Sequence, residues 1–140
     1  MKLTEVAAAA IDRTAADGGT EFLLGQRAPG TFYPGFWEFP GGKVELGEAP
    51  EAALVRELKE ELDLTLETNA LDPFAFASHA YPDFHLLMPL YTATRWNGEP
   101  KLDPNAAQAM QWIRPRDLRA IAMPPADVVL VDRLIERSAA

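Results

Sequence analysis

The protein has 140 residues, a formal net charge of −8 and no cysteine. This length suits a single domain over residues 1–140, and the lack of cysteine excludes disulfides and thiolate metal sites and fits a cytoplasmic protein. The acidic balance disfavours binding to a nucleic-acid polymer, and no apolar run approaches the length of a membrane span.

Two paired strands are predicted at the start of the chain. The first covers Glu5–Arg13, where alanines separate Val6 from Ile11, which is typical of a strand buried on both faces. Ala16–Gly19 contains Asp and Gly, which tolerate positive φ in turns. The second strand, Glu21–Arg27, therefore returns alongside the first as a hairpin.

A loop, a short strand and a helix follow. Ala28–Gly35 is rich in Pro and Gly and predicts a loop, whereas residues 36–40 predict a short strand that Pro40 ends. Pro50–Leu62 predicts a helix because Pro suits its first turn and leucine recurs every fourth residue. The leucines that form this core-facing stripe are Leu54, Leu58 and Leu62.

The second half of the chain predicts three more strands and two helices, which completes an α/β domain. Pro89 indicates a sheet edge or a bulge, because proline cannot donate a ladder hydrogen bond. The expected strands are 74–81, 84–96 and 110–113, and the expected helices are 114–121 and 124–138, with a polar loop at 97–106.

Three carboxylates share one face of the first predicted helix. Glu57, Glu60 and Glu61 have i, i+3, i+4 spacing, at which like charges repel on a bare helix. A Mg²⁺ ion, which selects oxygen ligands and keeps room for substrate phosphates, would reverse that cost. Arg56 can hold a carboxylate in bidentate fashion, and a carbonyl from the Gly41–Gly42 turn can add an oxygen. A solvated acidic face is the simpler alternative for such a helix.

The longer pattern resembles the Nudix box, GX5EX7REUXEEXGU with U aliphatic. Gly42, Glu48 and Arg56 begin its segments, and every specified position matches except the last glycine, which is Asp63 here. Because that glycine often takes positive φ, which Asp tolerates better than most residues, we expect a modest loss of stability. "WEFPGGKVELGE", "RWNGEP", a late Trp and "PPAD" extend the resemblance to the MutT branch over nearly the whole chain.

The resemblance implies a fold and a reaction. Nudix proteins have an α/β/α sandwich around a mixed β-sheet. MutT-type enzymes hydrolyse nucleoside triphosphates to the monophosphate and pyrophosphate, through water attack at the β-phosphorus with Mg²⁺ or Mn²⁺. Their best-known substrates carry 8-oxoguanine, and removal of these nucleotides prevents mutation. We therefore expect a nucleotide hydrolase that sanitises 8-oxo-dGTP. The lack of an obvious apolar interface stripe in the sequence leads us to expect a monomer.

The resemblance also implies roles for individual residues around the phosphates. Arg56 would orient Glu57, Glu48 would support the metal cluster, and one of the glutamates or a loop acid would accept the proton of the attacking water. We therefore expect Glu57, Glu60, Arg56 and Glu48 to be catalytic. The metal ligands by this resemblance are the Gly41 carbonyl, Glu57, Glu60 and Glu61.

A second set of residues matches the family's nucleotide pocket. Asp127 takes the place of an Asn in a bacterial relative, so it accepts hydrogen bonds when ionised and also donates when protonated. Its alternative role is the N-cap of the last helix. Phe84 lies where that relative has arginine, which predicts an apolar contact. The expected substrate-binding residues are Arg27, Glu38, Phe39, Pro40, Gly41, Lys43, Phe84 and Asp127.

One further departure concerns a loop glutamate that relatives often carry six residues before the late Trp. Ala106 occupies that position before Trp112, and Asp103 is the nearest acid. Either Asp103 substitutes for it or the site has one ligand fewer. His79 and His85 have no second nitrogen ligand nearby and are interpreted as structural.

Several substrates and one other class of function stay open at this stage. Asp127 permits a hydrolase of CTP or other pyrimidine triphosphates, and Tyr81 is weak evidence for a diadenosine polyphosphate hydrolase. Asp63 and Ala106 slightly favour a non-catalytic module that binds a nucleotide or a protein.

Overall fold

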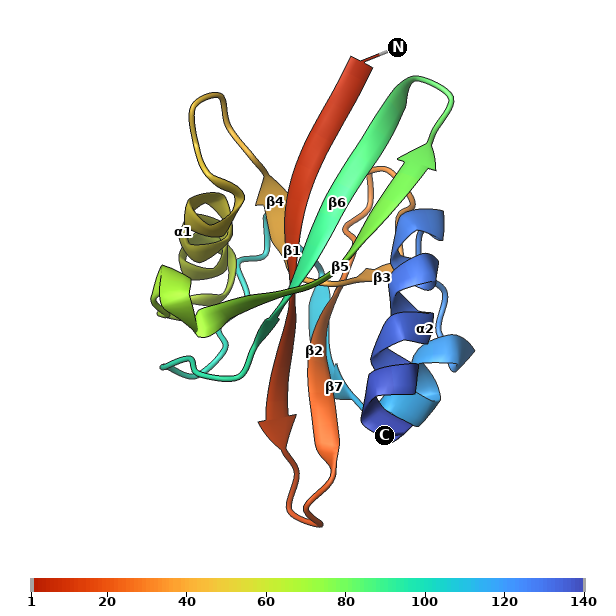
Figure 1. The fold of residues 1–140 in the computed structure, drawn as a ribbon. Helices are drawn as coiled ribbons and strands as arrows, with labels where there is room; N and C mark the ends of the chain where they lie inside the picture. The colour runs from red at the N-terminus through yellow and green to blue at the C-terminus, as the bar shows by residue number, and fades with distance from the viewer. Residues whose placement is uncertain (1, 140) are drawn as a thin grey trace.

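The computed structural model describes residues 2–139 and shows a mixed β-sheet between two helices (Figure 1). The sheet has seven strands in the order β3-β2-β1-β6-β5, with β4 paired to β1 and β7 paired to β2. The strands are β1 (Lys2–Thr14), β2 (Thr20–Gln26), β3 (Trp37–Glu38), β4 (Gly41–Lys43), β5 (Leu71–Ala80), β6 (Phe84–Ala93) and β7 (Ala109–Ile113). The helices are α1 (Pro50–Leu62) and α2 (Pro125–Ala139), with 3₁₀ turns at Thr68–Ala70 and Pro115–Ala120.

This arrangement confirms the predicted α/β/α sandwich. The helix predicted at Pro50–Leu62 is α1, and the predicted hairpin is β1 and β2. The strand expected at 84–96 ends at Ala93, and the Gly41–Gly42 pair, expected as a turn, lies in strand β4. No helix within residues 2–139 combines the length and hydrophobicity needed to cross a bilayer.

Strand β1 is buried on both faces, as its alanines predict. Alternate residues of a strand point to opposite faces, so each helix packs on its own set. Ala7, Ala9 and Ile11 belong to the core cluster under α1, whereas Ala8 and Ala10 belong to the cluster under α2. Small side chains on the central strand leave room for the large ones that the two helices bring.

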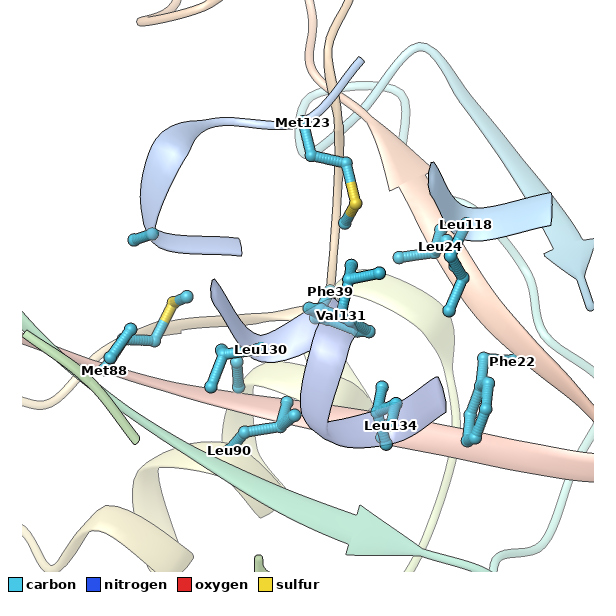
Figure 2. Close-up of a cluster of buried hydrophobic side chains, with 14 of the residues drawn as sticks. Phe22, Leu24, Phe39, Met88, Leu90, Leu118, Met123, Leu130, Val131 and Leu134 are labelled. Atoms are coloured by element: carbon cyan, nitrogen blue, oxygen red, sulfur yellow. The ribbon is translucent and has the colours of Figure 1, made fainter. Parts of the chain in front are cut away.

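Helix α2 closes one face of the sheet (Figure 2). Leu130 and Leu134 are fully buried and pack in one cluster with Leu24 and Leu90 of the sheet. Burying one such side chain contributes about 1.5–3 kcal/mol, so α2 is held mainly by this apolar contact. On the other face the leucine stripe of α1 is buried as predicted, with Leu54, Leu58 and Leu62 in the second cluster.

One edge of β1 pairs with two different strands along its length. It pairs with β4 near its start and with β2 near its end, while its other edge follows β6 in parallel. Between the two partners, the Ala9 N–H donates to the Pro40 carbonyl at 2.9 Å. A Cβ on Gly41 would lie 2.0 Å from the Ala7 carbonyl oxygen, so only glycine lets β4 approach β1 this closely. We call this division of the β1 edge the fork.

The expectation that Pro89 marks a sheet edge is wrong. Strand β6 is internal, because β1 pairs with it on one side and β5 on the other. The β1–β6 ladder instead skips positions between Leu87 and Leu90, around the residue that has no N–H to donate. The bulge lies in the neighbouring strand, between Pro73 and Ala75, and not at Pro89 itself.

The first turn of α1 is fixed by a contact from the sheet. Ala49 at the N-cap makes no side-chain cap, and Pro50 follows it. The Tyr91 hydroxyl of β6 donates to the Glu51 carboxylate at 2.6 Å, and burial together with this contact raises the pKa of Tyr91 to about 12. The helix that carries the predicted site is therefore anchored at its start.

The last turn of α1 ends at the residue that departs from the Nudix pattern. Asp63 has φ 55° and ψ 31°, which is the left-handed conformation expected for the family's glycine. Its N–H donates to the Lys59 carbonyl at 3.1 Å, and its carboxylate accepts from Lys59 Nζ at 2.6 Å. Asp63 therefore fills the glycine position without changing the helix end.

We predict that stability decreases in the order Asp63→Gly, wild type, Asp63→Ala. Glycine adopts positive φ without strain, but it loses the exposed ion pair with Lys59. We therefore expect Asp63→Gly to raise the free energy of unfolding by about 0.5 kcal/mol. Alanine keeps the cost and loses the pair, so it destabilises by about 1 kcal/mol. Urea unfolding measures both free energies, and an Asp63→Ala variant as stable as Asp63→Gly would contradict the strained conformation.

Candidate functional site

A cleft of about 560 Å³ opens beside the fork. Its walls come from the ends of β2, β3 and β4, from α1, from β6 and from the start of α2, so residues far apart in sequence meet there. Among the predicted substrate-binding residues, those that line it are Arg27, Glu38, Gly41, Lys43, Phe84 and Asp127. Glu61 of α1 lines the same cleft.

The other two predicted pocket residues do not line this cleft. Phe39 is 4% exposed, and its side chain belongs to the core under α2 (Figure 2). Alternation along the segment explains this, because Glu38 points to the cleft and its neighbour points the other way. Pro40 lines a narrower adjoining cavity of about 40 Å³, together with Glu61 and Ala106.

Arg56 organises the acidic face of α1. Its Nε and Nη2 each donate to Glu48 at 2.9 Å, and these bonds lower the pKa of Glu48 to about 2. Its Nη1 donates to Glu57 Oε1 at 2.9 Å, whereas Glu60, which is largely exposed, lies 3.5 Å away. The contact between Arg56 and Glu57 has the geometry that an orienting role requires.

Glu57 and Glu61 are brought together above the glycine turn. A Cβ on Gly42 would lie 2.3 Å from the Glu57 carboxyl carbon, so the carboxylate rests in space that only glycine leaves open. Burial, and then a hydrogen bond with Glu57 and the charges of Glu57 and Glu38, raise the pKa of Glu61 to about 8. These carboxyl groups therefore repel one another in a partly buried place.

The acidic face is not gathered into a complete ligand cage. Within residues 2–139, no group of three or more His, Cys, Asp or Glu side chains is placed to hold a metal ion, and Glu60 pairs with Arg56. The donor set nevertheless fits a hard divalent cation, because carboxylate and carbonyl oxygens are its preferred ligands. A positive charge beside Glu57 and Glu61 would also favour the ionised form of Glu61, whose pKa is raised by burial and then by the neighbouring carboxylates.

A second group of charged residues, Arg27, Glu38 and Asp127, lines the same cleft. Arg27 Nη1 donates to Glu38 Oε2 at 2.6 Å, yet burial still raises the pKa of Glu38. Asp127 is 5% exposed and accepts a bond from the Phe39 N–H at 3.2 Å. Burial, with a further contribution from the charge of Glu38, raises the pKa of Asp127 to about 8.

The N-cap interpretation of Asp127 is wrong. Helix α2 begins at Pro125, so Asp127 is the third residue of the first turn, and its carboxylate reaches across to the backbone of Phe39. The side chain therefore ties α2 to the segment that crosses the fork. Such a contact between distant segments leaves no local signal in the sequence.

Sequence reasoning missed part of an aromatic group in the cleft. Phe32, Tyr33 and Tyr81 line it together with Phe84, which was predicted. The residues "TFYPG" in the loop before β3 were the only hint for Phe32 and Tyr33. Tyr81, which the sequence offered only as weak evidence for a diadenosine polyphosphate hydrolase, is buried and also lines the cleft.

A comparison with protein families decides the identity of the fold. The NUDIX domain model matches residues 3–134. The chain belongs to the Nudix family.

Named relatives place this Nudix protein in the MutT branch. The 8-oxo-dGTP diphosphatase of Escherichia coli K12 is 35% identical over 81% of this chain and 85% of its own length. The CTP pyrophosphohydrolase of the same organism is 34% identical over 100% of this chain and 97% of its own length. A crystal structure of MutT NUDIX hydrolase from Burkholderia pseudomallei superposes with a TM-score of 0.82, at 28% identity, over 96% of this chain and 99% of that one. The Nudix protein is thus a hydrolase of nucleotide phosphoanhydrides.

The loop departure of this Nudix hydrolase lies inside the site. Ala106 lines both the cleft and the narrower cavity, between Glu38 and Glu61. The Asp103 carboxylate accepts a bond from the Asn105 N–H at 3.0 Å and lines neither space. Asp103 therefore stabilises its own turn, and the position facing the glutamates carries only a methyl group.

The stability of this Nudix hydrolase should fall with rising pH because of Asp127. Below about pH 4 the carboxyl is protonated in both the folded and unfolded states. Between about pH 4 and 8 the unfolded chain releases the proton while the folded state retains it, so the free energy of unfolding decreases. Asp127→Asn, neutral throughout, should match wild type near pH 4 and be more stable by about 1–3 kcal/mol at pH 8.

Urea unfolding at a series of pH values tests this dependence. Asp132→Asn, at an exposed position of the same helix, serves as the matched control and should show little change across the window. A stability difference between Asp127→Asn and wild type that stays constant from pH 4 to 8 would rule out the raised pKa.

Proposed function

We propose that the chain is a Mg²⁺-dependent nucleoside triphosphate pyrophosphohydrolase, with 8-oxo-dGTP as a substrate. The products are the nucleoside monophosphate and pyrophosphate, formed by water attack at the β-phosphorus. The observation that carries the proposal is a cleft that Glu61, from the acidic face of α1, lines together with Glu38 and Asp127. The carboxylates beside the β4 glycines suit a cation and phosphates, and Glu38 and Asp127 suit the polar edge of a base.

The metal would be held at the glycine turn and the acidic face. Its ligands in this proposal are the Gly41 carbonyl, Glu57, Glu60 and Glu61, with Mn²⁺ as an alternative ion. A bound cation supplies neutralisation of phosphate charge and a lowered pKa of bound water. Glu60 is exposed and can rotate from its longer contact with Arg56 toward the turn.

The remaining charged residues hold the carboxylates in position and neutralise the charge of the triphosphate. Arg56 keeps Glu57 and Glu48 in fixed orientations, and its own pKa is raised further by Glu48, so it stays protonated at any working pH. Lys43 and Arg27 bring positive charge to the cleft, where triphosphate would lie. One of the α1 carboxylates accepts the proton of the attacking water.

Base recognition rests on the two acids that differ in protonation. Asp127, with its pKa near 8, keeps a proton at neutral pH and can therefore donate and accept, whereas Glu38 paired with Arg27 accepts. A guanine edge, which carries N–H donors beside a carbonyl, complements this pair. The 8-oxo-dGTP diphosphatase of E. coli as a relative supports the same choice.

CTP is the second candidate substrate. The relative matched over the whole chain is a CTP pyrophosphohydrolase, and protonated Asp127 can also meet the amino and ring nitrogen of cytosine. A diadenosine substrate has less support, because the Tyr81 hydroxyl accepts a bond from the Ala126 N–H and is buried. Relatives named as diphosphatases favour hydrolysis over a non-catalytic module. We also propose a cytoplasmic monomer with one domain over residues 1–140.

The reaction is tested by incubating the protein with Mg²⁺ and 8-oxo-dGTP, dGTP, CTP and UTP in ¹⁸O-labelled water. We expect monophosphate and pyrophosphate, with the label in pyrophosphate because attack is at the β-phosphorus. Glu60→Gln should lower kcat by at least about tenfold, since it removes a proposed metal ligand. Glu99→Gln, in an exposed loop, is the matched control and should keep kcat.

Each result bears on a separate part of the proposal. Absence of pyrophosphate from every substrate would refute hydrolysis, and label in the monophosphate would place attack at the α-phosphorus instead. Full activity of Glu60→Gln would refute its role as a metal ligand.

Ala106→Glu should raise kcat several-fold. The new carboxylate would enter the cleft between Glu38 and Glu61 and restore an acid at the position that relatives often use. Steady-state kinetics at saturating Mg²⁺ measures the change, with Ala106→Gln as a control of equal size without charge. An unchanged kcat for Ala106→Glu would show that this loop takes no part in catalysis.

A further inference from the structure

Four aromatic side chains form a continuous wall of the cleft, which we call the aromatic wall: Phe32, Tyr33, Tyr81 and Phe84. Phe32 is central, because its ring centroid lies 4.5 Å from that of Tyr33, 5.4 Å from that of Tyr81 and 6.2 Å from that of Phe84. Tyr81 and Phe84 stack at 5.1 Å. Despite these contacts Phe32 is 51% exposed, so much of its ring remains available.

The wall is held in place by contacts from several elements. Arg27, which pairs with Glu38, also donates from Nε to the carbonyl of Phe32. Tyr33 has φ 53°, a strained conformation for a residue of its size, and such strain persists only where the surroundings impose it. The Tyr81 hydroxyl accepts a bond from the Ala126 N–H of α2 at 3.3 Å. The rings are therefore positioned before any ligand arrives.

The aromatic rings of the cleft complement its charged residues Glu38 and Asp127. Glu38 and Asp127 can bond only to the edge of a planar base, whereas Phe32 and Phe84 present apolar surface to its face. A cleft of about 560 Å³ with mostly apolar walls and a few converging polar groups is typical of a small-molecule site. An exposed aromatic ring at such a cleft is best explained by a planar ligand.

We propose that the aromatic wall stacks on the nucleobase and that Phe32 determines specificity by favouring purines over pyrimidines. A purine has the larger ring system and so covers more of the wall than a pyrimidine does. This inference rests on the proposed function only for the identity of the ligand as a nucleotide. It favours guanine nucleotides over CTP as substrates of the same cleft.

Calorimetric binding without divalent metal isolates this contact from catalysis. GMP, 8-oxo-GMP, CMP and ribose 5-phosphate are titrated into wild type and Phe32→Ala, whose exposed position leaves the fold intact. We expect Phe32→Ala to weaken both purine monophosphates by about tenfold and CMP by less, since each stacked base contributes through its ring face. Ribose 5-phosphate has no base, so its Kd should not change.

Two further variants control for loss of apolar surface. Phe32→Tyr keeps the ring and should retain purine binding. Phe76→Ala removes a phenylalanine that is still more exposed, at 65%, on β5 and outside the cleft, and should change none of the affinities.

Several outcomes would overturn the inference. These are unchanged purine binding in Phe32→Ala, an equal loss for ribose 5-phosphate, an equal loss for CMP, or a wild type that binds no nucleoside monophosphate. Failure of the proposed function looks different, because a protein that stacks GMP through Phe32 yet releases no pyrophosphate would refute hydrolysis and leave the stacking contact established.

Discussion

The fork along one edge of β1 is the constraint on which the site depends. Because β1 exchanges one partner strand for another, the segment from β3 to β4 must cross between them, with its Pro40 carbonyl bonded to Ala9 and its glycines against β1 and Glu57. This crossing turns Glu38 toward the cleft and Phe39 into the core. The edge of the sheet thus supplies both the glycines of the proposed metal site and one wall of the cleft.

The acidic side chains in and beside that cleft differ in how well a neighbouring positive charge compensates them. Arg56 satisfies Glu48 and Glu57, and Arg27 satisfies Glu38, but the half-buried Glu61 and the buried Asp127 lie near other carboxylates and keep raised pKa values. A cation beside Glu61 would favour its ionised form, whereas burial favours the protonated form of Asp127. The proposed metal site and the proposed base-binding residues thus share one acidic cleft.

The predictions from sequence agree with the structure where they rest on residues that are neighbours in the chain. The α1 leucines and the double-sided burial of β1 were predictable because periodicity records which faces are buried. Pro89 misled because a proline can sit inside a sheet when the ladder skips around it, which depends on two neighbouring strands. The role of Asp127 was ambiguous because its acceptor bond comes from Phe39, 88 residues away. The aromatic wall was missed except for Phe84, because its rings come from the loop before β3 and from the turn between β5 and β6 with the start of β6, which meet only after folding.

The sequence by itself determined the family, the helix that carries the acidic face and the two glycines below it, because these depend on residue types at fixed short spacings. It also located the two departures, and Asp63 indeed takes the left-handed conformation. Tertiary structure alone decided that Asp103 faces its own turn while Ala106 faces the glutamates, that Arg27 is bound to Glu38, and that Asp127 is buried. Side-chain direction, burial and the resulting pKa values arise from contacts between distant segments, and no local pattern encodes them.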